Sequence, residues 1–298
     1  MPYFSVITPS WNQGKFLKGC IESVVAQGDP HFEHLILDNV STDETGSIVK
    51  GFPHIQFLSE RDRGQSHAVN KGFLRARGEI ICWLNSDDAY PPGVFDRLRQ
   101  RFADPSVDVV FGHVRQVSYA GADEQIAEAK FDRREDLIRW WSRAVKLHQP
   151  AVFFRNSVQN AIGLLREDLH LVMDYEYWWR MSERHRFHLV PEVLAVQHRQ
   201  PESKTVRDWV GVYAERERVF RPFYSMIDRG DRAGLMREKR VAMCERYLDE
   251  AYACVGSQPL DAWRSLVRSF RERPASFFGM RWVGLVRRFL VGGRLRAS

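Results

Sequence analysis

Short runs of apolar residues recur through the first hundred positions of the chain. They alternate little between apolar and polar positions, which is typical of strands in a parallel sheet covered by helices on both faces. The runs predict four strands, at 4–8, 34–38, 55–58 and 79–85. Between them, apolar residues recur at helical spacing in 14–26, 43–50 and 65–76. This alternation predicts an α/β fold with a doubly wound, mostly parallel sheet between helices.

Later parts of the chain follow different patterns. Further strands are expected at 108–114, 114–119 and 151–154, and further helices at 133–143 and 173–184. Past residue 205 the pattern becomes almost continuous helix, with segments at 206–225, 232–254, 258–271 and 276–291. Turn signals separate these helical segments. We therefore expect an α/β domain over 1–205 and a basic helical C-terminal extension over 206–298.

One short motif predicts a helix start. Ser41 and Glu44 lie three positions apart in STDE, which is the form of a capping box. We therefore expect the helix over 43–50 to begin there.

Composition narrows the class of protein. Of the 298 residues, 44% are hydrophobic, which is enough for one large core, and no apolar run is long enough to span a membrane. The four cysteines form no CxxC pair and no metal-ligand spacing. The N-terminal segment lacks the basic head and long apolar run of a signal peptide. We therefore expect a cytoplasmic protein.

The net charge of +6 is concentrated in the C-terminal third. Residues 1–204 carry 25 Lys and Arg against 27 Asp and Glu, whereas residues 205–298 carry 19 against 11. From Trp263 onward there are nine arginines and one acidic residue, Glu272. No nucleic-acid recognition motif accompanies this charge, so we expect no nucleic-acid partner.

The segment 278–291 has an amphipathic pattern. Its apolar face holds Phe278, Trp282, Leu285, Val286 and Phe289, and its other face holds Arg281, Arg287 and Arg288. Such a helix can lie at the inner face of a membrane, attracted to anionic lipid. It can equally pack on the protein and leave its arginines in water. The sequence leaves both alternatives open.

Polar residues follow each of the first four predicted strands. They are Thr8-Pro9-Ser10-Trp11-Asn12, Asp38-Asn39, Asp62 to Gln65, and Asp87-Asp88. Because the carboxyl ends of parallel strands meet at one edge of a sheet, we expect them to line one crevice. Adjacent carboxylates repel unless a cation lies near them, and Mg²⁺ or Mn²⁺ binds one or two carboxylates together with phosphate oxygens. Asp87 and Asp88 thus predict a metal site for a nucleotide diphosphate, with helix capping as the alternative.

The ordered series of motifs resembles a family 2 glycosyltransferase of the GT-A fold. The matching strings are VITPSWNQGKFL, LDNVSTDET, SERDRGQSHAVNKGFLRARGEIICWLNSDD, HQPAVFFR and MDYEYWWR. They extend from about residue 3 to about residue 205, which is two-thirds of the chain. A single SDD has little specificity, whereas the series in this order and at these separations is strongly specific.

The resemblance implies roles for the residues at the strand ends. Asp88 would bind Mn²⁺ or Mg²⁺, and Asp87 would face the ribose of a nucleotide-diphosphate sugar. The other residues implied for the nucleotide pocket are Pro9, Trp11, Asp38, Asn39, Asp62 and Gln65. The family usually has a second acid at the position of Asn39. An asparagine can still accept through its amide oxygen, so the identity of the base stays open.

The resemblance also implies residues for the acceptor side. The family's catalytic base lies in a Glu-Asp pair, and here Met173 replaces the Glu while Asp174 takes the base position. Glu176 supplies an acid two residues further on, and His148 would lie at the active-site wall beside the donor. The alternative role of Asp174 is to cap the helix that follows.

A third metal contact is less well defined by the resemblance. Family members carry a histidine before a Ser-Lys-Thr sequence, which is present here as Ser203-Lys204-Thr205. The aligned position holds Gln200, and His198 lies two residues earlier. His198 is therefore a candidate metal ligand.

The implied reaction is a single displacement that inverts the anomeric carbon. Asp174 would take the proton of an acceptor hydroxyl, on a glycan or lipid-linked intermediate of the cell-surface polysaccharide type. One alternative is a nucleotide-sugar-binding or scaffold protein without turnover, which Met173 and Asn39 keep open. A sugar nucleotidyltransferase is a weaker alternative, because the loop PSWNQGK has only one glycine and one lysine to hold a triphosphate.

Overall fold

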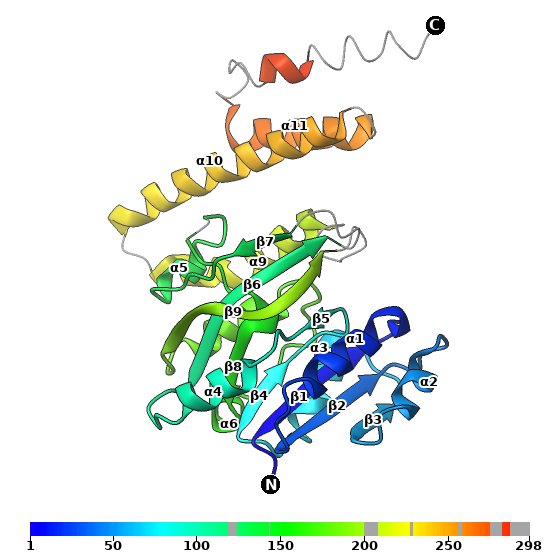
Figure 1. Cartoon of the computed structure of the whole chain (residues 1–298). Coiled ribbons are helices and arrows are strands. Elements are labelled where there is room, and N and C mark those ends of the chain that lie inside the picture. Colours follow the sequence, from blue (N-terminus) through cyan, green and yellow to red (C-terminus); the bar gives the residue numbers. More distant parts are fainter. Residues whose placement is uncertain are drawn as a thin grey trace, which may run out of the picture. The chain divides into compact units, whose positions relative to one another are not determined.

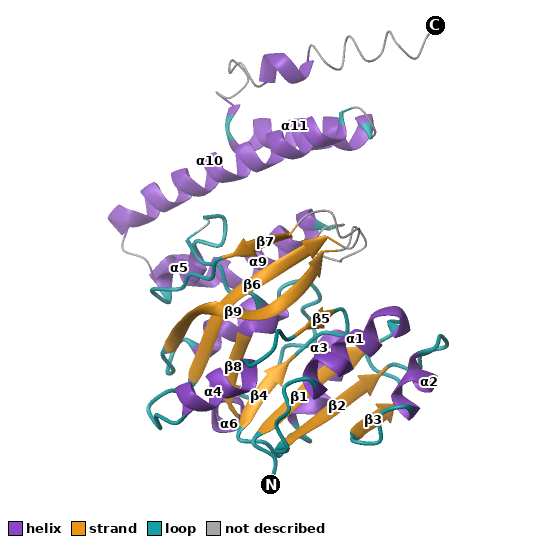
Figure 2. Cartoon of the chain, viewed as in Figure 1, coloured by secondary structure: helices purple, strands orange, loops and turns teal. Residues whose placement is uncertain are grey.

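The computed structural model describes residues 1–118, 124–142, 144–199, 208–226, 229–255, 258–274 and 282–286. The chain forms two compact units (Figure 1). The first joins Met1–Leu137 to Ala144–Phe220, and the second joins Ile138–Arg143 to Arg221–Ser298. The first unit contains the sheet and the second is helical (Figure 2). The units divide later in the chain than the boundary that we expected near residue 205.

The sheet has the strand order β3-β2-β1-β4-β8-β6-β9-β5. Its parallel part consists of β1 (Phe4–Ser10), β2 (Phe32–Asp38), β3 (Ile55–Ser59) and β4 (Ile80–Trp83). These are the four strands that the apolar runs predict. β1 and β4 are buried along their whole length and β2 along all but its first residue, as expected for strands covered on both faces.

Helices cover both faces of the parallel strands. α1 (Gly14–Val25) and α4 (Val94–Phe102) pack on the face that carries Val6. Ile7 points to the opposite face, since successive side chains of a strand alternate. There α3 (Gln65–Phe73) lies so close that a Cβ added to Gly72 would collide with Ile7. The prediction of a doubly wound sheet is therefore confirmed.

The capping box predicted at Ser41 and Glu44 is wrong. α2 (Thr45–Lys50) has Glu44 at its N-cap position, and Glu44 makes no side-chain capping bond. The Ser41 side chain instead donates to the carboxylate of Asp38. Because Ser41 bonds to the buried Asp38 carboxylate, it does not cap α2.

The second half of the sheet is mixed. β8 (Val152–Arg155) runs antiparallel to β4 and to β6 (Val109–Ser118), and β9 (Phe187–Arg199) runs parallel to β6. The two strands predicted over 108–119 are thus a single strand, β6. The short strands β5 (Asp88–Ala89) and β7 (Glu124–Ala127) pair with β9 and β6.

The helices of this half are shorter than predicted. The segment predicted over 133–143 forms only α5 (Glu135–Ile138), and the one over 173–184 forms α7 (Met173–Met181). The remaining elements are η1 (Gln149–Ala151), α6 (Asn156–Ile162) and α9 (Trp209–Phe220). The helix predicted over 206–225 is divided, because α9 ends at Phe220 and η2 (Arg221–Met226) follows in the other unit.

The second unit is built around α10 (Arg229–Cys254) and α11 (Pro259–Glu272). Its core includes Cys244, Leu248, Ala251, Leu266, Trp282 and Leu285. Trp282 and Leu285 therefore pack on the protein, which is the second of the two alternatives for their helical face. Phe278, Arg281, Arg287, Arg288 and Phe289 lie outside the described residues. Nowhere in the described residues is a helix both long and apolar enough to span a bilayer.

Candidate active site

The carboxyl ends of β1, β2 and β3 lie side by side (Figure 1). In the strand register Ser10 pairs with Asp38, and Asp38 pairs with Ser59. The predicted convergence of the strand ends is therefore present, and the loops that follow them share one edge of the sheet.

Asp38 organises the loop after β2. Its side chain is nearly inaccessible and accepts hydrogen bonds from the backbone N–H of Ser41 at 3.0 Å, the Ser41 hydroxyl and the Ser59 hydroxyl at 2.6 Å. Such bonds from short polar side chains fix turns locally. Asp38 thereby ties the loop after β2 to the end of β3.

Asn39 and Asp62 connect that loop to the start of α3. Asn39 Oδ1 accepts the N–H of Asp62 at 2.9 Å, and Asp62 Oδ1 accepts the N–H of Gly64 at 2.8 Å. Gly64 has a φ of 123°, a conformation that favours glycine, directly before Gln65 begins α3. The Asn39 amide oxygen, which we expected to face a nucleotide base, thus also holds this turn.

Side-chain amides link α3 to the end of β4, just before the acidic pair. Asn85 Oδ1 accepts from Gln65 Nε2 at 3.0 Å and from Trp83 Nε1 at 3.2 Å. Asn85 Nδ2 donates to Gln149 Oε1 at 2.8 Å, and Gln149 Nε2 donates to the Trp83 carbonyl at 2.6 Å. Gln149 is buried. These bonds fix the backbone just before the acidic pair.

The neighbouring His148 does not share the hydrogen bonds that Gln149 makes to Asn85 and Trp83. Burial lowers the pKa of His148 to about 4, so its imidazole is neutral at pH 7. Its Nε2 is buried and has no hydrogen-bond partner among the described residues. Sequence analysis selected His148 from the HQP string, whereas Gln149 makes the contacts to the strand. The only sequence signal for Gln149 was its position next to His148 in the HQP string.

The acidic pair is held by the end of β9. Asp88 pairs with Gln197 in the β5–β9 ladder, and the next residue of β9 is His198. His198 Nδ1 donates to the Asp87 carbonyl at 2.7 Å. A carbonyl can only accept, so the proton is on Nδ1 and, in the neutral ring, the lone pair is on Nε2.

Burial disfavours the charged forms of both carboxyls, and at Asp88 the charge of Asp87 adds to this effect. The pKa of Asp88 is raised well above its usual value, first by burial and then by the Asp87 charge. Burial also raises the pKa of Asp87, and the nearby His198 partly opposes this effect. In the described part of the chain no Lys or Arg forms a salt bridge with Asp88. Across the same residues, no group of three or more His, Cys, Asp or Glu converges as a complete metal site.

Asp174 lies in the first turn of α7. Its Oδ1 accepts the N–H of Tyr175 at 2.7 Å, whereas Val172 occupies the N-cap position and α7 has no side-chain capping bond, so the alternative role of Asp174 as a helix cap is wrong. Burial raises the pKa of Asp174, and the positive charge of Arg216 acts in the opposite direction. The Arg216 guanidinium lies 4.6 Å from the centre of the Tyr175 ring.

Glu176 is engaged in an ion pair within α7. Its two carboxylate oxygens lie 2.9 Å and 3.1 Å from Arg180 Nε and Nη2. Arg180 also donates to the carbonyls of Ile162 and Leu164. Glu176 is 4% exposed and Arg180 is partly exposed, and the pair fastens α7 to the end of α6.

α9 fixes the backbone that leads into α7. The Glu215 carboxylate accepts the backbone N–H groups of His170, Leu171 and Val172, at 2.8–3.2 Å. On the same helix, Arg218 donates to the Asp168 carbonyl at 2.7 Å. Sequence analysis missed Glu215 because α9 lay in the predicted extension, and no spacing links a helical Glu to a loop 45 residues earlier.

Pro9 and Trp11 differ in exposure. Pro9 is buried within β1, opposite Leu37, whereas Trp11 is 63% exposed just after the strand. Asn12, with a φ of 52°, accepts the N–H of Thr42 through Oδ1 at 2.9 Å. The loop after β1 is therefore tied to the loop after β2, with the Trp11 ring in solvent.

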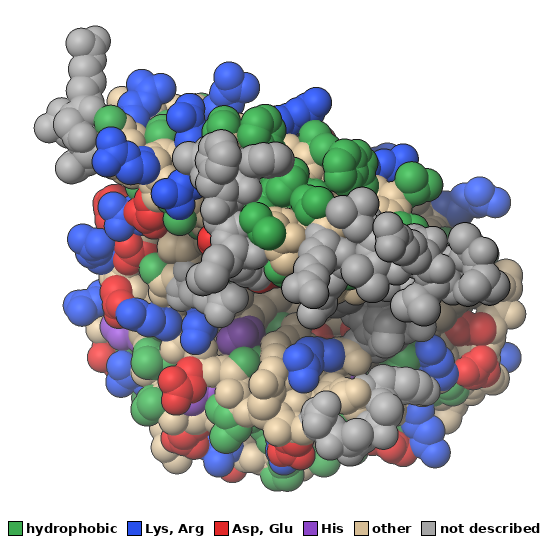
Figure 3. All heavy atoms as spheres, turned by 90° about the horizontal axis from the view of Figure 1, so that it is seen from above, with side chains coloured by type: hydrophobic (Ala, Val, Ile, Leu, Met, Phe, Trp, Pro, Cys, Tyr) green, Lys and Arg blue, Asp and Glu red, His purple; other side chains and the backbone are tan. Residues whose placement is uncertain are grey.

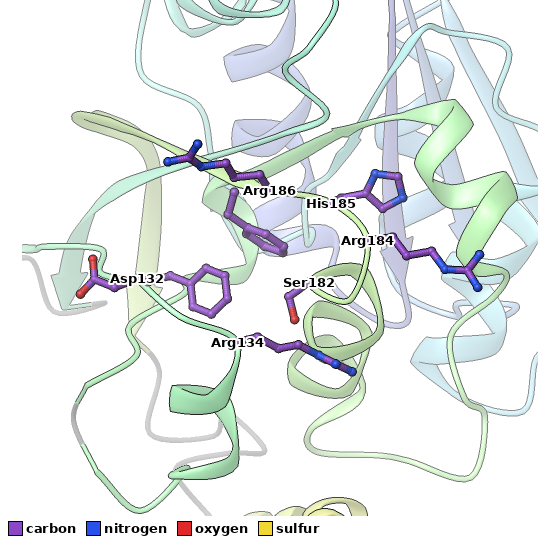
Figure 4. Close-up of a pocket in the computed structure, with 8 residues that line it drawn as sticks. Asp132, Arg134, Ser182, Arg184, His185 and Arg186 are labelled. Atoms are coloured by element: carbon purple, nitrogen blue, oxygen red, sulfur yellow. The ribbon is translucent and has the colours of Figure 1, made fainter. Parts of the chain in front are cut away.

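A pocket of about 490 Å³ lies elsewhere in the first unit (Figure 4). Its lining includes Phe187, which begins β9, whereas His198 lies near the other end of that strand. In Figure 4 the charged ends of Asp132, Arg184 and Arg186 extend away from the middle of the pocket. This pocket is therefore separate from the strand ends where the predicted site residues gather.

Comparison with known proteins identifies the family. The family model "Glycosyl transferase family 2" matches residues 5–161. The uncharacterized protein MT1568 of Mycobacterium tuberculosis (strain CDC 1551 / Oshkosh) is 27% identical over 224 residues, covering 69% of this chain and 70% of that protein. GlyG of Streptococcus pneumoniae, named as a glycosyltransferase, is 32% identical over 114 residues, covering 37% of this chain and 38% of GlyG.

Two solved structures share the fold. The mannosyltransferase PcManGT of Pyrobaculum calidifontis, solved with GDP-Man and Mn²⁺, aligns with a TM-score of 0.57 at 18% identity, covering 99% of this chain and 86% of that one. S. aureus TarS 1–349, solved with UDP-GlcNAc, aligns with a TM-score of 0.56 at 17% identity, covering 98% and 81%. The chain belongs to glycosyl transferase family 2 and is a glycosyltransferase with the GT-A fold.

Proposed function

We propose that the protein is an inverting, metal-assisted transferase. It moves one sugar from a nucleotide-diphosphate sugar to an acceptor hydroxyl. The observation that carries the proposal is the position of His198, whose ring is held through Nδ1 by the carbonyl of Asp87, next to the strand pairing of Asp88. Metal-binding histidines are commonly oriented in this way, with the other ring nitrogen bonded to a carbonyl.

The residues present fit a divalent cation. The Asp88 carboxylate and His198 Nε2 are the candidate donors, and a nucleotide diphosphate would complete the set, which the protein residues alone do not. Oxygen and imidazole donors together suit Mn²⁺, whereas Mg²⁺ favours oxygen alone. When bound, the cation would act as a Lewis acid that neutralises the departing diphosphate.

The other residues of the donor side keep their predicted roles in the proposal. Asp87 would face the ribose, and the exposed ring of Trp11 is available to stack on a base. Pro9 and Gln65 would shape the pocket, and Asp38, Asn39 and Asp62 would act as much through the loops they hold as by direct contact.

Asp174 is the proposed base. The acceptor oxygen forms a bond to the anomeric carbon while the bond from that carbon to the diphosphate breaks. The hydroxyl proton passes to the Asp174 carboxylate. The raised pKa of Asp174 makes it a stronger base than an exposed Asp. One displacement of this kind inverts the configuration.

The remaining predicted residues take no part in the proton transfer of this proposal. Glu176 positions α7 through Arg180. His148 forms part of the wall beside Gln149, and burial lowers its pKa to about 4, so it is neutral there. Gln200 and Ser203-Lys204-Thr205 lie outside the described residues.

The acceptor and location are also proposals. Bacillus subtilis TuaG, 37% identical over 95 residues (30% of this chain and 37% of TuaG), is named as a putative teichuronic acid biosynthesis glycosyltransferase. A cell-surface polysaccharide or its lipid-linked intermediate is therefore the proposed acceptor. The proposed location is the cytoplasm, with contact to the inner face of the membrane.

A binding protein without turnover is the second candidate. It is favoured by Met173, which stands in place of the family's Glu, and by the amide oxygen of Asn39, which already has the N–H of Asp62 as a partner. The two candidates differ in sugar release, not in nucleotide binding.

Thermal shift measurements test the donor site first. We expect one of UDP, GDP, dTDP and CDP to raise the melting temperature with Mn²⁺ and not with EDTA, because a ligand that binds the folded state stabilises it. Asp88→Asn should remove that shift, whereas Asp132→Asn, an exposed acid in the other pocket, should keep it. No metal-dependent shift with any nucleotide would sink the metal–diphosphate proposal.

Sugar release separates the two candidates. With the matching nucleotide sugar, wild type should release nucleotide diphosphate in the presence of acceptor, and Asp174→Asn should bind donor without releasing it. Donor binding without release by wild type, across glycan and lipid-linked acceptors, would favour the binding protein.

A further inference from the structure

A row of paired side chains crosses four strands of the first unit, which Figure 1 labels. Gln125 on β7 lies opposite Gln116 on β6, and Gln116 lies opposite Gln197 on β9. Gln197 in turn lies opposite Asp88 on β5. Residues that pair directly across strands carry their side chains on the same face of the sheet. We call Gln125, Gln116 and Gln197 the glutamine row, which has Asp88 at its end.

The neighbouring pairs show which face the row occupies. Two positions earlier on β6 and β9, Val114 lies opposite Ala195, and both belong to the core cluster that α1 and α4 cover. Tyr90 belongs to the same cluster and follows Asp88 by two positions. Side chains two positions apart in a strand share a face. The glutamine row and Asp88 therefore continue this face beyond the core.

The amides of the row are bonded in one direction. Gln125 Nε2 donates to Gln116 Oε1 at 3.1 Å, and Gln116 Nε2 donates to Gln197 Oε1 at 3.0 Å. The oxygen of Gln197 is therefore engaged. A carboxamide nitrogen has two N–H groups to donate, and Gln197 Nε2 donates to none of the described residues. Within the described residues, the row thus ends in an unused N–H donor next to Asp88.

The carboxyl of Asp88 accounts for this direction. Turning all three amides over would keep both hydrogen bonds, and it would place the oxygen of Gln197 at the end of the row. The Cβ atoms of directly opposed residues are about 5 Å apart, so that oxygen would meet carboxyl oxygens of the same sign of charge. The arrangement with the N–H groups at the end avoids this repulsion.

We infer that Gln197 is a further residue that binds the nucleotide sugar, and that its Nε2 group donates a hydrogen bond to a diphosphate oxygen. The inference rests on the proposed function, in which Asp88 holds the cation that binds this diphosphate. A neutral N–H group suits a phosphate oxygen and does not repel the cation as Lys or Arg would. Gln116 is a positioning residue, because it holds the amide oxygen of Gln197 away from the anion.

The alternative is that the row only holds β7 on the sheet. β7 is four residues long, and in the sheet that the structure describes it pairs with β6 alone. A purely structural row predicts a loss of stability in its variants without a change in nucleotide affinity.

Calorimetric titration of the full chain distinguishes the two roles without relying on turnover. The probe is the nucleoside diphosphate that the thermal shift screen selects, with Mn²⁺ present. Gln197→Leu should weaken its binding about tenfold or more, because a hydrogen bond to a charged group is lost. The corresponding nucleotide sugar should lose affinity by the same factor. A loss confined to the nucleotide sugar would assign Gln197 to the sugar and overturn the inference.

Gln116→Glu tests the direction of the row. A glutamate carboxylate accepts and cannot donate, so it should attract Gln197 Nε2 and turn the Gln197 oxygen toward the diphosphate. Nucleotide affinity should then fall at least as far as in Gln197→Leu. Gln125→Leu removes only the far end of the row and should change the affinity little.

Gln100→Leu and Gln100→Glu are the matched controls, because Gln100 is exposed on α4. Both should bind the nucleotide as wild type does. Lys and Arg side chains are spread over the surface that Figure 3 shows, and the net charge is +6. Titration at physiological salt therefore limits the general attraction of the anionic probe.

The outcomes separate this inference from the proposed function. Wild type that binds no nucleotide in a metal-dependent way would overturn both. Metal-dependent binding that Gln197→Leu and Gln116→Glu leave unchanged would overturn the role of Gln197 alone. If the leucine variant does not fold, Gln197→Asn replaces it, because its shorter amide should lose the same contact.

Discussion

Glu215 and Val172 are joined by a hydrogen bond from the Val172 N–H to the Glu215 carboxylate, at 3.2 Å. Val172 directly precedes α7, which carries Asp174 in its first turn. With the N–H groups of His170 and Leu171, this carboxylate organises the whole approach to the helix. The segment that leads into α7 is therefore held by α9, which lies beyond the part matched by the family model.

Glu215→Ala should impair turnover more than donor binding. Each hydrogen bond to a charged group contributes about 1.5–3 kcal/mol, so the loop before α7 should loosen and kcat should fall about tenfold to a hundredfold. The nucleotide-induced thermal shift should persist. Glu22→Ala, a substitution of an exposed Glu on α1, is the matched control. Equal losses of kcat and nucleotide binding would show that Glu215 affects the donor site as well as Asp174.

The acid limb of the pH–rate profile should depend on Arg216. A base must be ionised to act, so activity should rise with pH through the pKa of Asp174, which burial raises. The Arg216 charge opposes that rise. Arg216→Met should therefore move the acid limb to higher pH. An unmoved limb would mean that another group controls the profile.

Asp174→Asn should stabilise the protein at neutral pH while abolishing turnover. The folded-state pKa of Asp174 is raised, so ionisation costs stability above the unfolded-state pKa of about 3.9, and the neutral Asn avoids that cost. The difference in melting temperature between variant and wild type should shrink as pH falls through that value. An Asn variant that is less stable at pH 7 would show that the charge is better compensated than its surroundings indicate.

Arg180→Met should lower both stability and turnover. It leaves the Glu176 carboxylate buried without its partner, a change that typically costs about 3–5 kcal/mol. Denaturant unfolding would measure the loss of stability, and kcat per folded molecule should also fall, because Arg180 helps to position α7 and with it Asp174. Arg166→Met, at an exposed arginine paired with exposed Asp168, should cost far less.

His198→Ala should weaken Mn²⁺ dependence more than nucleotide preference. Metal titrations followed by thermal shift should show about tenfold to a hundredfold weaker Mn²⁺ binding in the presence of nucleotide. Asn at the same position retains a donor for the Asp87 carbonyl and should recover part of the stability but not the Mn²⁺ affinity. Identical metal titrations for wild type and both variants would exclude His198 as a ligand.

The sequence predicted the parallel half of the fold well. Buried strands such as β1 and β4 leave long apolar runs, and their ends carry the polar residues that converge near Asp38. Short motifs in fixed order then selected Asp87, Asp88 and Asp174 as candidate site residues. These signals are local in sequence, which is why the sequence alone was enough to predict these features.

The remaining features depend on contacts between distant residues. The Ser41 hydroxyl had two competing partners, and only the folded loop shows that it donates to Asp38. Gln149 contacts Asn85 across 64 positions, and Glu215 reaches the loop before α7 from another helix. Trp282 was equally suited to lipid and to core, because an amphipathic pattern defines an apolar face but not what covers it.

The hydrogen bond between His198 and Asp87 also bears on the order in which parts of the chain fold during synthesis. Its two residues are 111 positions apart, and the β5–β9 ladder beside it needs the same late segment. During synthesis, the parallel strands can pair long before β9 leaves the ribosome, since domains form as their contacts become available. The acidic pair gains its final setting only afterwards. A nascent chain that stops short of β9 is therefore expected to fold in part and yet be unable to hold its donor.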